Sequence, residues 1–253
     1  MSEWNETFSD VDAVLFDLGN TLVAYYKAEE FLPILHECIV AASDVLTQHP
    51  AHNRRRPNIE QLYERAKAFN RERPDGRVWP LEERLAEIFA HADGAAPPDA
   101  LLDQMSGRFL EPIFATANLN PDAVPVLTKV RELGLKSAIV SNSPWGSSPS
   151  HWRAELTRWG LLELVDTAAF CVDAGWRKPD PRVFQHALTS LGVRADRAVF
   201  VGDDLHWDVE GARRAGLTPI LLADVPAQAR CRTISRLSAL IPLLERRTAR
   251  SVS

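Results

Sequence analysis

Five short runs of apolar residues predict buried strands along this chain. The runs are Ala13–Asp17, Lys136–Ser141, Ala168–Val172, Ala198–Gly202 and Pro219–Ala223. Their apolar positions are continuous rather than alternating, which is typical of strands covered on both faces of a parallel sheet. Helical patterns separate the later runs, so we expect right-handed βαβ units and a doubly wound α/β sheet.

Capping residues predict where the helices between these strands begin and end. The dipeptide Asp180-Pro181 opens one helix as N-cap and first residue, and Gly192 closes it. A second helix covers Val124–Leu133, and Ser150 is the expected N-cap of a third. The fourth is expected from Asp208 to Ala215.

The segment from about residue 25 to residue 116 departs from this alternation, because it contains no strand-like run. Its apolar positions repeat at helical spacing in four stretches, near residues 31–45, 59–69, 80–89 and 101–113. We therefore predict an all-helical domain at residues 25–116. It would be inserted into an α/β core domain formed by residues 1–24 and 117–253.

Composition limits the partners of this chain. Twenty-nine basic against 34 acidic residues give a net charge of −5, which argues against nucleic-acid binding. No apolar run reaches the roughly 18 residues of a membrane-spanning helix, and the acidic, polar N-terminus does not resemble a secretory signal. The cysteines Cys38, Cys171 and Cys231 match no metal or redox spacing. We expect a cytoplasmic protein with free thiols.

Residues able to bind ligands or take part in catalysis follow the predicted strands. In open parallel sheets, ligands bind at the carboxyl ends of the strands. Asp17 and Asp203 follow two of them and would repel each other unless a cation lies between them, and oxygen ligands favour Mg²⁺. A carboxylate can also attack phosphorus as a nucleophile. The polar residues at these ends are Asp17, Gly19, Ser141, Asn142, Lys178, Asp203, Asp204 and Asp208.

With these residues the chain resembles the haloacid dehalogenase superfamily, most of whose members are phosphohydrolases. The matches occur in order, each after its own predicted strand. The resemblance implies a Rossmann-like core, and the helical segment lies where the first class of cap domain is inserted in that superfamily. The matching motifs are Phe16–Leu22 with Asp17 as nucleophile position, Ser141, Lys178, and Gly202-Asp203-Asp204 with Asp208.

The resemblance implies a magnesium site. Asp17 would be both nucleophile and metal ligand. The backbone carbonyl of Gly19 and the carboxylate of Asp203 would complete the ligands from the protein. Asp208, or alternatively Asp204, would orient metal-bound water.

The resemblance also implies a phosphoryl site, in which Ser141, the backbone of Asn142 and Lys178 hold the transferred group. The expected function is Mg²⁺-dependent hydrolysis of a small phosphorylated metabolite through a phospho-aspartate on Asp17. The sequence specifies neither the substrate nor the oligomeric state.

One position departs from the pattern of the superfamily. Its phosphatases usually carry a second aspartate two residues after the nucleophile, as general acid and base, and here that residue is Gly19. General acid–base catalysis contributes about 10²–10⁴-fold, so we expect slow turnover of poor leaving groups. His206 is the nearest titratable replacement in sequence, or simply a surface histidine. The departure leaves two alternatives open: a phospholigand-binding protein with weak turnover, and a dehalogenase.

Aromatic residues adjoin the motifs. Trp145, Trp176 and Trp207 lie close in sequence to the second, third and fourth motifs. They would form either an aromatic rim for the substrate or packing beneath the helical segment. Tyr25 and Tyr26 lie where the chain enters that segment, so one of them is a candidate substrate contact.

Overall fold

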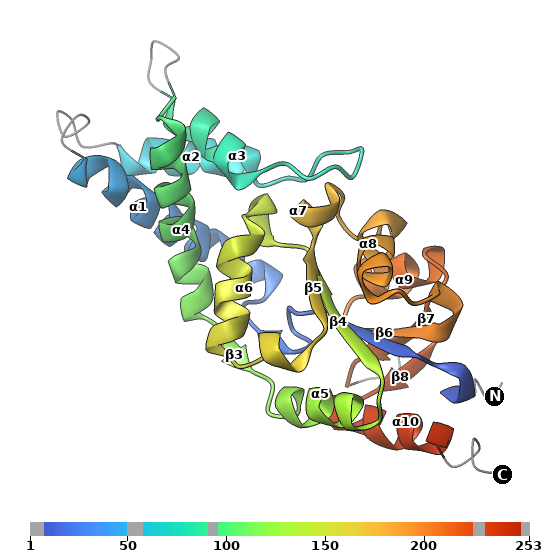
Figure 1. Cartoon of the computed structure of the whole chain (residues 1–253). Helices are drawn as coiled ribbons and strands as arrows, with labels where there is room; N and C mark the ends of the chain where they lie inside the picture. The colour runs from blue at the N-terminus through green and yellow to red at the C-terminus, as the bar shows by residue number, and fades with distance from the viewer. Residues whose placement is uncertain (1–7, 50–57, 91–95, 225–230, 249–253) are drawn as a thin grey trace.

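A six-stranded parallel sheet forms the centre of the molecule (Figure 1). The structure is a computed structural model that describes residues 8–49, 58–90, 96–224 and 231–248. The strand order is β5-β4-β1-β6-β7-β8, and the five predicted strands are confirmed. The sequence analysis missed β8, which is short and partly polar. The strands are β1 (Ala13–Phe16), β4 (Lys136–Ser141), β5 (Thr167–Phe170), β6 (Ala198–Gly202), β7 (Thr218–Leu222) and β8 (Arg232–Ile234).

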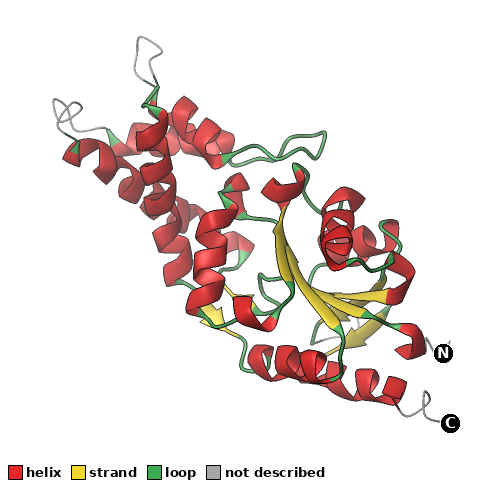
Figure 2. Ribbon diagram, viewed as in Figure 1, coloured by secondary structure: helices red, strands yellow, loops and turns green. Residues whose placement is uncertain are grey.

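Helices cover both faces of the sheet, as the continuous apolar runs predict (Figure 2). Ala13 and Leu15 of β1 belong to a core cluster shared with α8 (Pro181–Leu191) and α9 (Gly211–Arg214). Val14 and Phe16 alternate with them and belong to a larger cluster shared with α5 (Ala123–Glu132) and α10 (Ile241–Thr248). The doubly wound, Rossmann-like α/β fold is therefore confirmed.

Helix α8 begins and ends as its capping residues predict. The Asp180 side chain accepts a hydrogen bond from the backbone N–H of Arg182, and Gly192 adopts a left-handed conformation with φ 64°. Helix α6 (Pro149–Arg158) begins earlier than predicted, because Ser148 and not Ser150 is its N-cap.

The predicted helix from Asp208 to Ala215 is wrong in its first part, where the structure has a different kind of helix. A π-helical turn over Leu205–Glu210 comes first, and α9 follows it. The Asp204 carboxylate accepts hydrogen bonds from the backbone N–H groups of His206 and Trp207, which starts the turn upstream of Asp208.

The inserted segment is helical, as its periodicity predicts. Its helices pack on one another, and their apolar faces continue the larger core cluster of the sheet. An antiparallel pair, β2 (Val23–Ala24) with β3 (Asn118–Leu119), brings the departing and returning chains together at its base. The domain boundaries near residues 24 and 116 stay a prediction. The helices are α1 (Phe31–Gln48), α2 (Ile59–Phe69), α3 (Leu81–Phe89) and α4 (Asp99–Ala115).

A loop from the helical segment pairs with the core. The loop between α2 and α3 passes over α7 (Cys171–Ala174) in Figure 1. The backbone N–H of Val78 donates to the carbonyl of Gly175 at 3.1 Å, and that of Arg177 donates to the carbonyl of Gly76 at 3.0 Å. This pairing places the helical segment directly beside the loop that carries Lys178.

Arg84 holds that loop from inside the helical segment. Its side chain is fully buried, and its guanidinium donates to the carbonyls of Phe69 at 2.6 Å, Arg71 at 3.1 Å and Trp79 at 3.3 Å. It also lies over the ring of Trp145, 5.2 Å from the centroid. Burial lowers the pKa of Arg84 to about 10, opposed by the Glu72 carboxylate, so the group stays charged at neutral pH.

No helix in the described ranges is long and apolar enough to cross a membrane. Cys38, Cys171 and Cys231 are buried, and no disulfide joins them in this part of the chain.

We expect Arg84→Met to lower the free energy of unfolding by about 3 kcal/mol, because each buried carbonyl left without a donor costs about 1–3 kcal/mol. Arg73→Met is the control, since Arg73 is exposed and its ion pair with Glu83 is solvated. That control should change stability by less than about 0.5 kcal/mol. Urea unfolding measures both, and equal stabilities for the two variants would contradict the role given to Arg84.

Candidate active site

The carboxyl ends of three strands bring the polar residues of the motifs to one edge of the sheet. Phe16 of β1 is in register with Ile139 of β4 and Val201 of β6, so these strands end side by side. The backbone N–H of Asp17 donates to the carbonyl of Val201 at 2.9 Å, which fixes the start of the loop after β1. The edge holds Asp17, Ser141, Asn142 and Asp203 next to the loops that carry Lys178 and Asp208.

Lys178 joins two carboxylates at the centre of this edge. Its Nζ lies 2.5 Å from Asp17 Oδ1 and 2.7 Å from Asp208 Oδ1, and all three side chains are buried. The Asn142 side chain accepts from the Lys178 backbone N–H at 2.8 Å and donates to its carbonyl at 3.2 Å. Asn142 therefore holds the backbone of Lys178 in place.

Burial and mutual repulsion shift the titration of this cluster. Burial, together with the charges of Asp208 and Asp203, raises the pKa of Asp17, although Lys178 opposes the shift. Burial and the Asp208 charge raise the pKa of Asp203 to about 6. Burial alone would lower the pKa of Lys178, but the carboxylates of Asp17 and Asp208 outweigh it and raise that pKa. Lys178 is thus a permanent cation.

A divalent cation fits this cluster. Asp17, Asp203 and Asp208 each offer a carboxylate oxygen, and these oxygens lie within 4.8 Å of one another. When all three are ionised, their negative charge exceeds the charge of one ammonium in a buried place, and purely oxygen donors favour a hard ion such as Mg²⁺. Of the two aspartates considered for orienting water, Asp208 is in the cluster. The Asp204 carboxylate instead caps the π-helical turn.

Gly202 makes room for Asp208. A Cβ built on Gly202 would lie 2.3 Å from Asp208 Oδ2 and 2.4 Å from its Cγ. That same Oδ2 accepts from the backbone N–H of Asp204 at 3.1 Å, while Oδ1 accepts from Lys178. Both oxygens of Asp208 are therefore placed by its neighbours.

A small cavity opens beyond the ends of β1 and β4, with the phosphoryl-site residues Ser141 and Asn142 in its lining. Its volume is about 180 Å³, and we call it the strand-end cavity. Apart from its chain neighbours, a Cβ built on Gly19 would meet no described atom within 4 Å, so there is open space where a side chain at this position would begin. The cavity is lined by Leu18, Gly19, Asn20, Tyr25, Tyr26, Ser141, Asn142, Pro144 and Trp152.

A second cavity, of about 350 Å³, has Lys178 in its lining. It is lined by residues 72–76 of the helical segment together with Arg177, His206 and Trp207, and we call it the charged cavity. His206 is exposed, with its Nδ1 3.2 Å from Glu210 Oε2. Because His206 lines this cavity and not the strand-end cavity, it is not beside Gly19.

The three tryptophans of the proposed rim do not meet. Trp145 is 4% exposed and packs between Phe109 and Arg84, so packing describes its role. Trp176 lies against the guanidinium of Arg182, and Trp207 lines the charged cavity. Trp152, which the sequence does not single out, lines the strand-end cavity.

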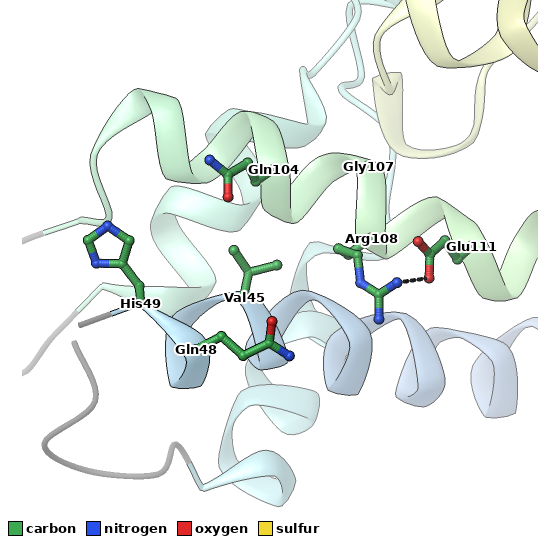
Figure 3. Close-up of a pocket in the computed structure, with 7 residues that line it drawn as sticks. All are labelled: Val45, Gln48, His49, Gln104, Gly107, Arg108 and Glu111. Atoms are coloured by element: carbon green, nitrogen blue, oxygen red, sulfur yellow. Dashed lines mark hydrogen bonds and ion pairs between the residues drawn. The ribbon is translucent and has the colours of Figure 1, made fainter. Parts of the chain in front are cut away.

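A third cavity lies within the helical segment, between α1 and α4, and holds none of the motif residues (Figure 3). Its volume is about 540 Å³. Arg108 and Glu111 pair with each other, so the described residues of its wall carry no concentrated charge.

The family of this chain follows from its comparison with known proteins. The model of the haloacid dehalogenase-like hydrolases matches residues 11–216. That match spans most of the chain and all the motif residues, so the chain belongs to this family and is a phosphatase-like hydrolase.

Relatives and solved structures agree with this assignment. The chain is 28% identical over 213 residues to a glyceraldehyde 3-phosphate phosphatase of Methanopyrus kandleri, covering 83% of each. It is 30% identical over 214 residues to a ribulose-1,5-bisphosphate 5-phosphatase of Halopiger xanaduensis, again covering 83% of each. A HAD phosphatase of Thermococcus onnurineus shares the fold, with a TM-score of 0.61 at 24% identity over 92% of this chain and 98% of that one.

We expect Gly202→Ala to destabilise the protein by about 1–3 kcal/mol, because its methyl group would overlap the Asp208 carboxylate. Gly19→Ala is the matched control at another strand end, where the added methyl meets open space. Thermal and urea unfolding should show a loss of stability only in the first variant. Equal stability of both variants would mean that Asp208 is not held against Gly202.

Proposed function

We propose that the protein is a Mg²⁺-dependent hydrolase of small phosphate monoesters, working through a phospho-aspartate on Asp17. The observation that carries the proposal is the buried Asp17 carboxylate, held by Lys178 at 2.5 Å within a cluster of three aspartates. Such a carboxylate is an oriented nucleophile beside a permanent cation.

In the first step, a carboxylate oxygen of Asp17 forms a bond to phosphorus while the bond from phosphorus to the ester oxygen breaks. The leaving group keeps the electron pair of that bond and takes a proton from solvent. In the second step, water attacks the phosphorus of phospho-Asp17, releases inorganic phosphate and regenerates the carboxylate. Lys178 and Ser141 would hold the phosphoryl oxygens during both steps.

Asp17, Asp203 and the carbonyl of Gly19 would hold the metal, with Asp208 beside it. When bound, Mg²⁺ would supply the positive charge that offsets the cluster and the incoming phosphate dianion. The four-helix segment at residues 25–116 would act as the cap domain that covers the site and excludes water.

The relatives support the class of substrate. The two relatives are named as phosphatases of small phosphorylated compounds, and the net charge of −5 gives no reason to expect a nucleic-acid partner. We propose a small phosphorylated metabolite as substrate and a cytoplasmic location.

One observation favours a second function. The open space at Gly19 leaves the site without the usual proton donor, which would suit a protein that binds a phosphorylated ligand and turns it over weakly. The number of phosphates released per chain separates the two: repeated release supports the hydrolase, and release of at most one supports the binding protein.

We expect Mg²⁺-dependent phosphate release from p-nitrophenyl phosphate or a member of a metabolite panel, abolished in Asp17→Asn. Mg²⁺ should also raise the Tm, because a ligand that binds only the folded state stabilises it. Asp203→Asn should lose most of this Tm shift. Asp196→Asn is the control, since that carboxylate is exposed and paired with Arg194. Indifference of both turnover and Tm to Mg²⁺ would contradict the metal site.

We expect Gly19→Asp to raise kcat for alkyl phosphates by at least about tenfold, because it adds a general acid where the structure has open space. The gain with p-nitrophenyl phosphate should be much smaller, since that leaving group needs no proton. Gly19→Asn is the matched control, with the same size and no acidic proton. If the aspartate and asparagine variants behave alike, the missing proton donor does not limit the reaction.

A further inference from the structure

The strand-end cavity is uncharged. Its lining contains two tyrosines, one tryptophan, one proline and one leucine, and its polar members are the amides Asn20 and Asn142 and the hydroxyl of Ser141. Among the described residues that line it there is no lysine, arginine, histidine, aspartate or glutamate. A leaving group that occupied this cavity would meet no side chain able to neutralise a second phosphate or a carboxylate.

The aromatic walls are held in place by their own neighbours. The ring of Tyr25 meets that of Trp152 edge-on, with centroids 5.7 Å apart and planes at 75°. The ring of Tyr26 stacks on Phe31 at 5.2 Å. Burial raises the pKa of both tyrosines, so both remain neutral phenols. The Tyr25 hydroxyl is buried and has no hydrogen-bond partner within the described residues.

The cations near the cavity are already paired. Lys178 is bound to Asp17 and Asp208. Arg177 donates to the carbonyl of Ser143 at 3.0 Å and lies 3.1 Å from a Glu72 carboxylate oxygen. Arg84 is buried among backbone carbonyls of the helical segment. Lys178 would hold the transferred phosphoryl group, and the two arginines are held by other partners, so these three cations are not left to bind an anionic leaving group.

The missing proton donor at Gly19 favours an aromatic leaving group for a separate reason. Without a proton donor, the leaving group departs as an anion, so its own acidity sets the barrier. A phenol ionises near pH ~10, as the tyrosine side chain does, whereas alkyl alcohols are far weaker acids. An aromatic alcohol therefore suits both the wall of the cavity and the missing proton donor.

We infer that the substrate is the phosphate monoester of a small, uncharged aromatic alcohol, whose ring lies against Tyr25 and Tyr26 in the strand-end cavity while Ser141, in the same lining, holds the phosphoryl group. The inference rests on the proposed phosphatase function. The cavity, at about 180 Å³, is smaller than the roughly 300–1,000 Å³ of pockets that hold drug-sized ligands, which limits the leaving group to about one ring.

Three matched esters test the inference on the wild-type protein: phenyl, 4-carboxyphenyl and benzyl phosphate. Phenyl phosphate should have the highest kcat/KM. The added carboxylate of 4-carboxyphenyl phosphate should raise KM by at least about tenfold, because a charge would be buried without a partner. Benzyl phosphate keeps the ring but leaves as a weaker acid, so it should lose kcat with little change in KM.

Three variants test the position of the ring. Tyr26→Leu keeps an apolar wall but removes the aromatic contact, and it should raise KM for phenyl phosphate by roughly threefold to tenfold. Trp207→Leu is the control in the charged cavity, where the same substitution should leave that KM unchanged. Pro144→Lys places a cation in the wall of the strand-end cavity and should lower KM for the 4-carboxyphenyl ester alone, a gain that a damaged fold would not produce.

Several outcomes of these measurements would overturn the inference. A preference for 4-carboxyphenyl phosphate, or a KM that responds to Trp207→Leu and not to Tyr26→Leu, would place the leaving group in the charged cavity and overturn the inference. An uncharged alkyl ester such as ethyl phosphate turned over faster than phenyl phosphate would overturn its aromatic part. In all these cases the phosphatase function stands. Failure to release phosphate from any ester would overturn that function, and the inference with it.

Discussion

The ion pairs of Lys178 with Asp17 and Asp208 are the interaction on which the site depends. Removing one partner from a buried ion pair typically costs about 3–5 kcal/mol, because the remaining charge is left without compensation. Asn142 fixes the backbone of Lys178, and Gly202 leaves the space that Asp208 occupies. Residues from three separate loops therefore hold Lys178 or the carboxylates that bind its ammonium group. The parallel register of β1 with β6 brings the loops of Asp17 and Asp208 together.

The helical segment is coupled to this centre through its backbone. The loop after α2 pairs with the chain at Gly175 and Arg177, immediately before Lys178. Arg84 orders that loop by donating to its carbonyls, and Trp145 from the loop after β4 packs against Arg84. Because these contacts lie between the segment and the loops of the site, a change in the packing of either one reaches the other.

The sequence predicts the sheet and the helices well because burial on both faces leaves uninterrupted apolar runs and because caps such as Asp180 and Gly192 act locally. It could not predict β8, whose pairing is settled by β7, or the π-helical turn, which the Asp204 side chain starts. The gathering of Asp17, Asp203 and Asp208 follows from topology. The roles of the tryptophans do not follow from topology, because a position close to a motif in sequence does not determine the direction of a side chain.

Gly19 connects the catalytic chemistry of the site with the lining of the strand-end cavity. A loss of the proton donor alone would predict a weaker enzyme for every ester. A cavity that accepts only uncharged aromatic groups would restrict the substrates without explaining the glycine. Taken together, the open space at Gly19 and the neutral walls of Tyr25 and Tyr26 describe one requirement, an ester whose leaving group is both apolar and acidic. Gly19 therefore suits a more reactive class of ester, for which a second carboxylate is unnecessary. The desolvation of such a carboxylate beside the apolar walls would also be unfavourable.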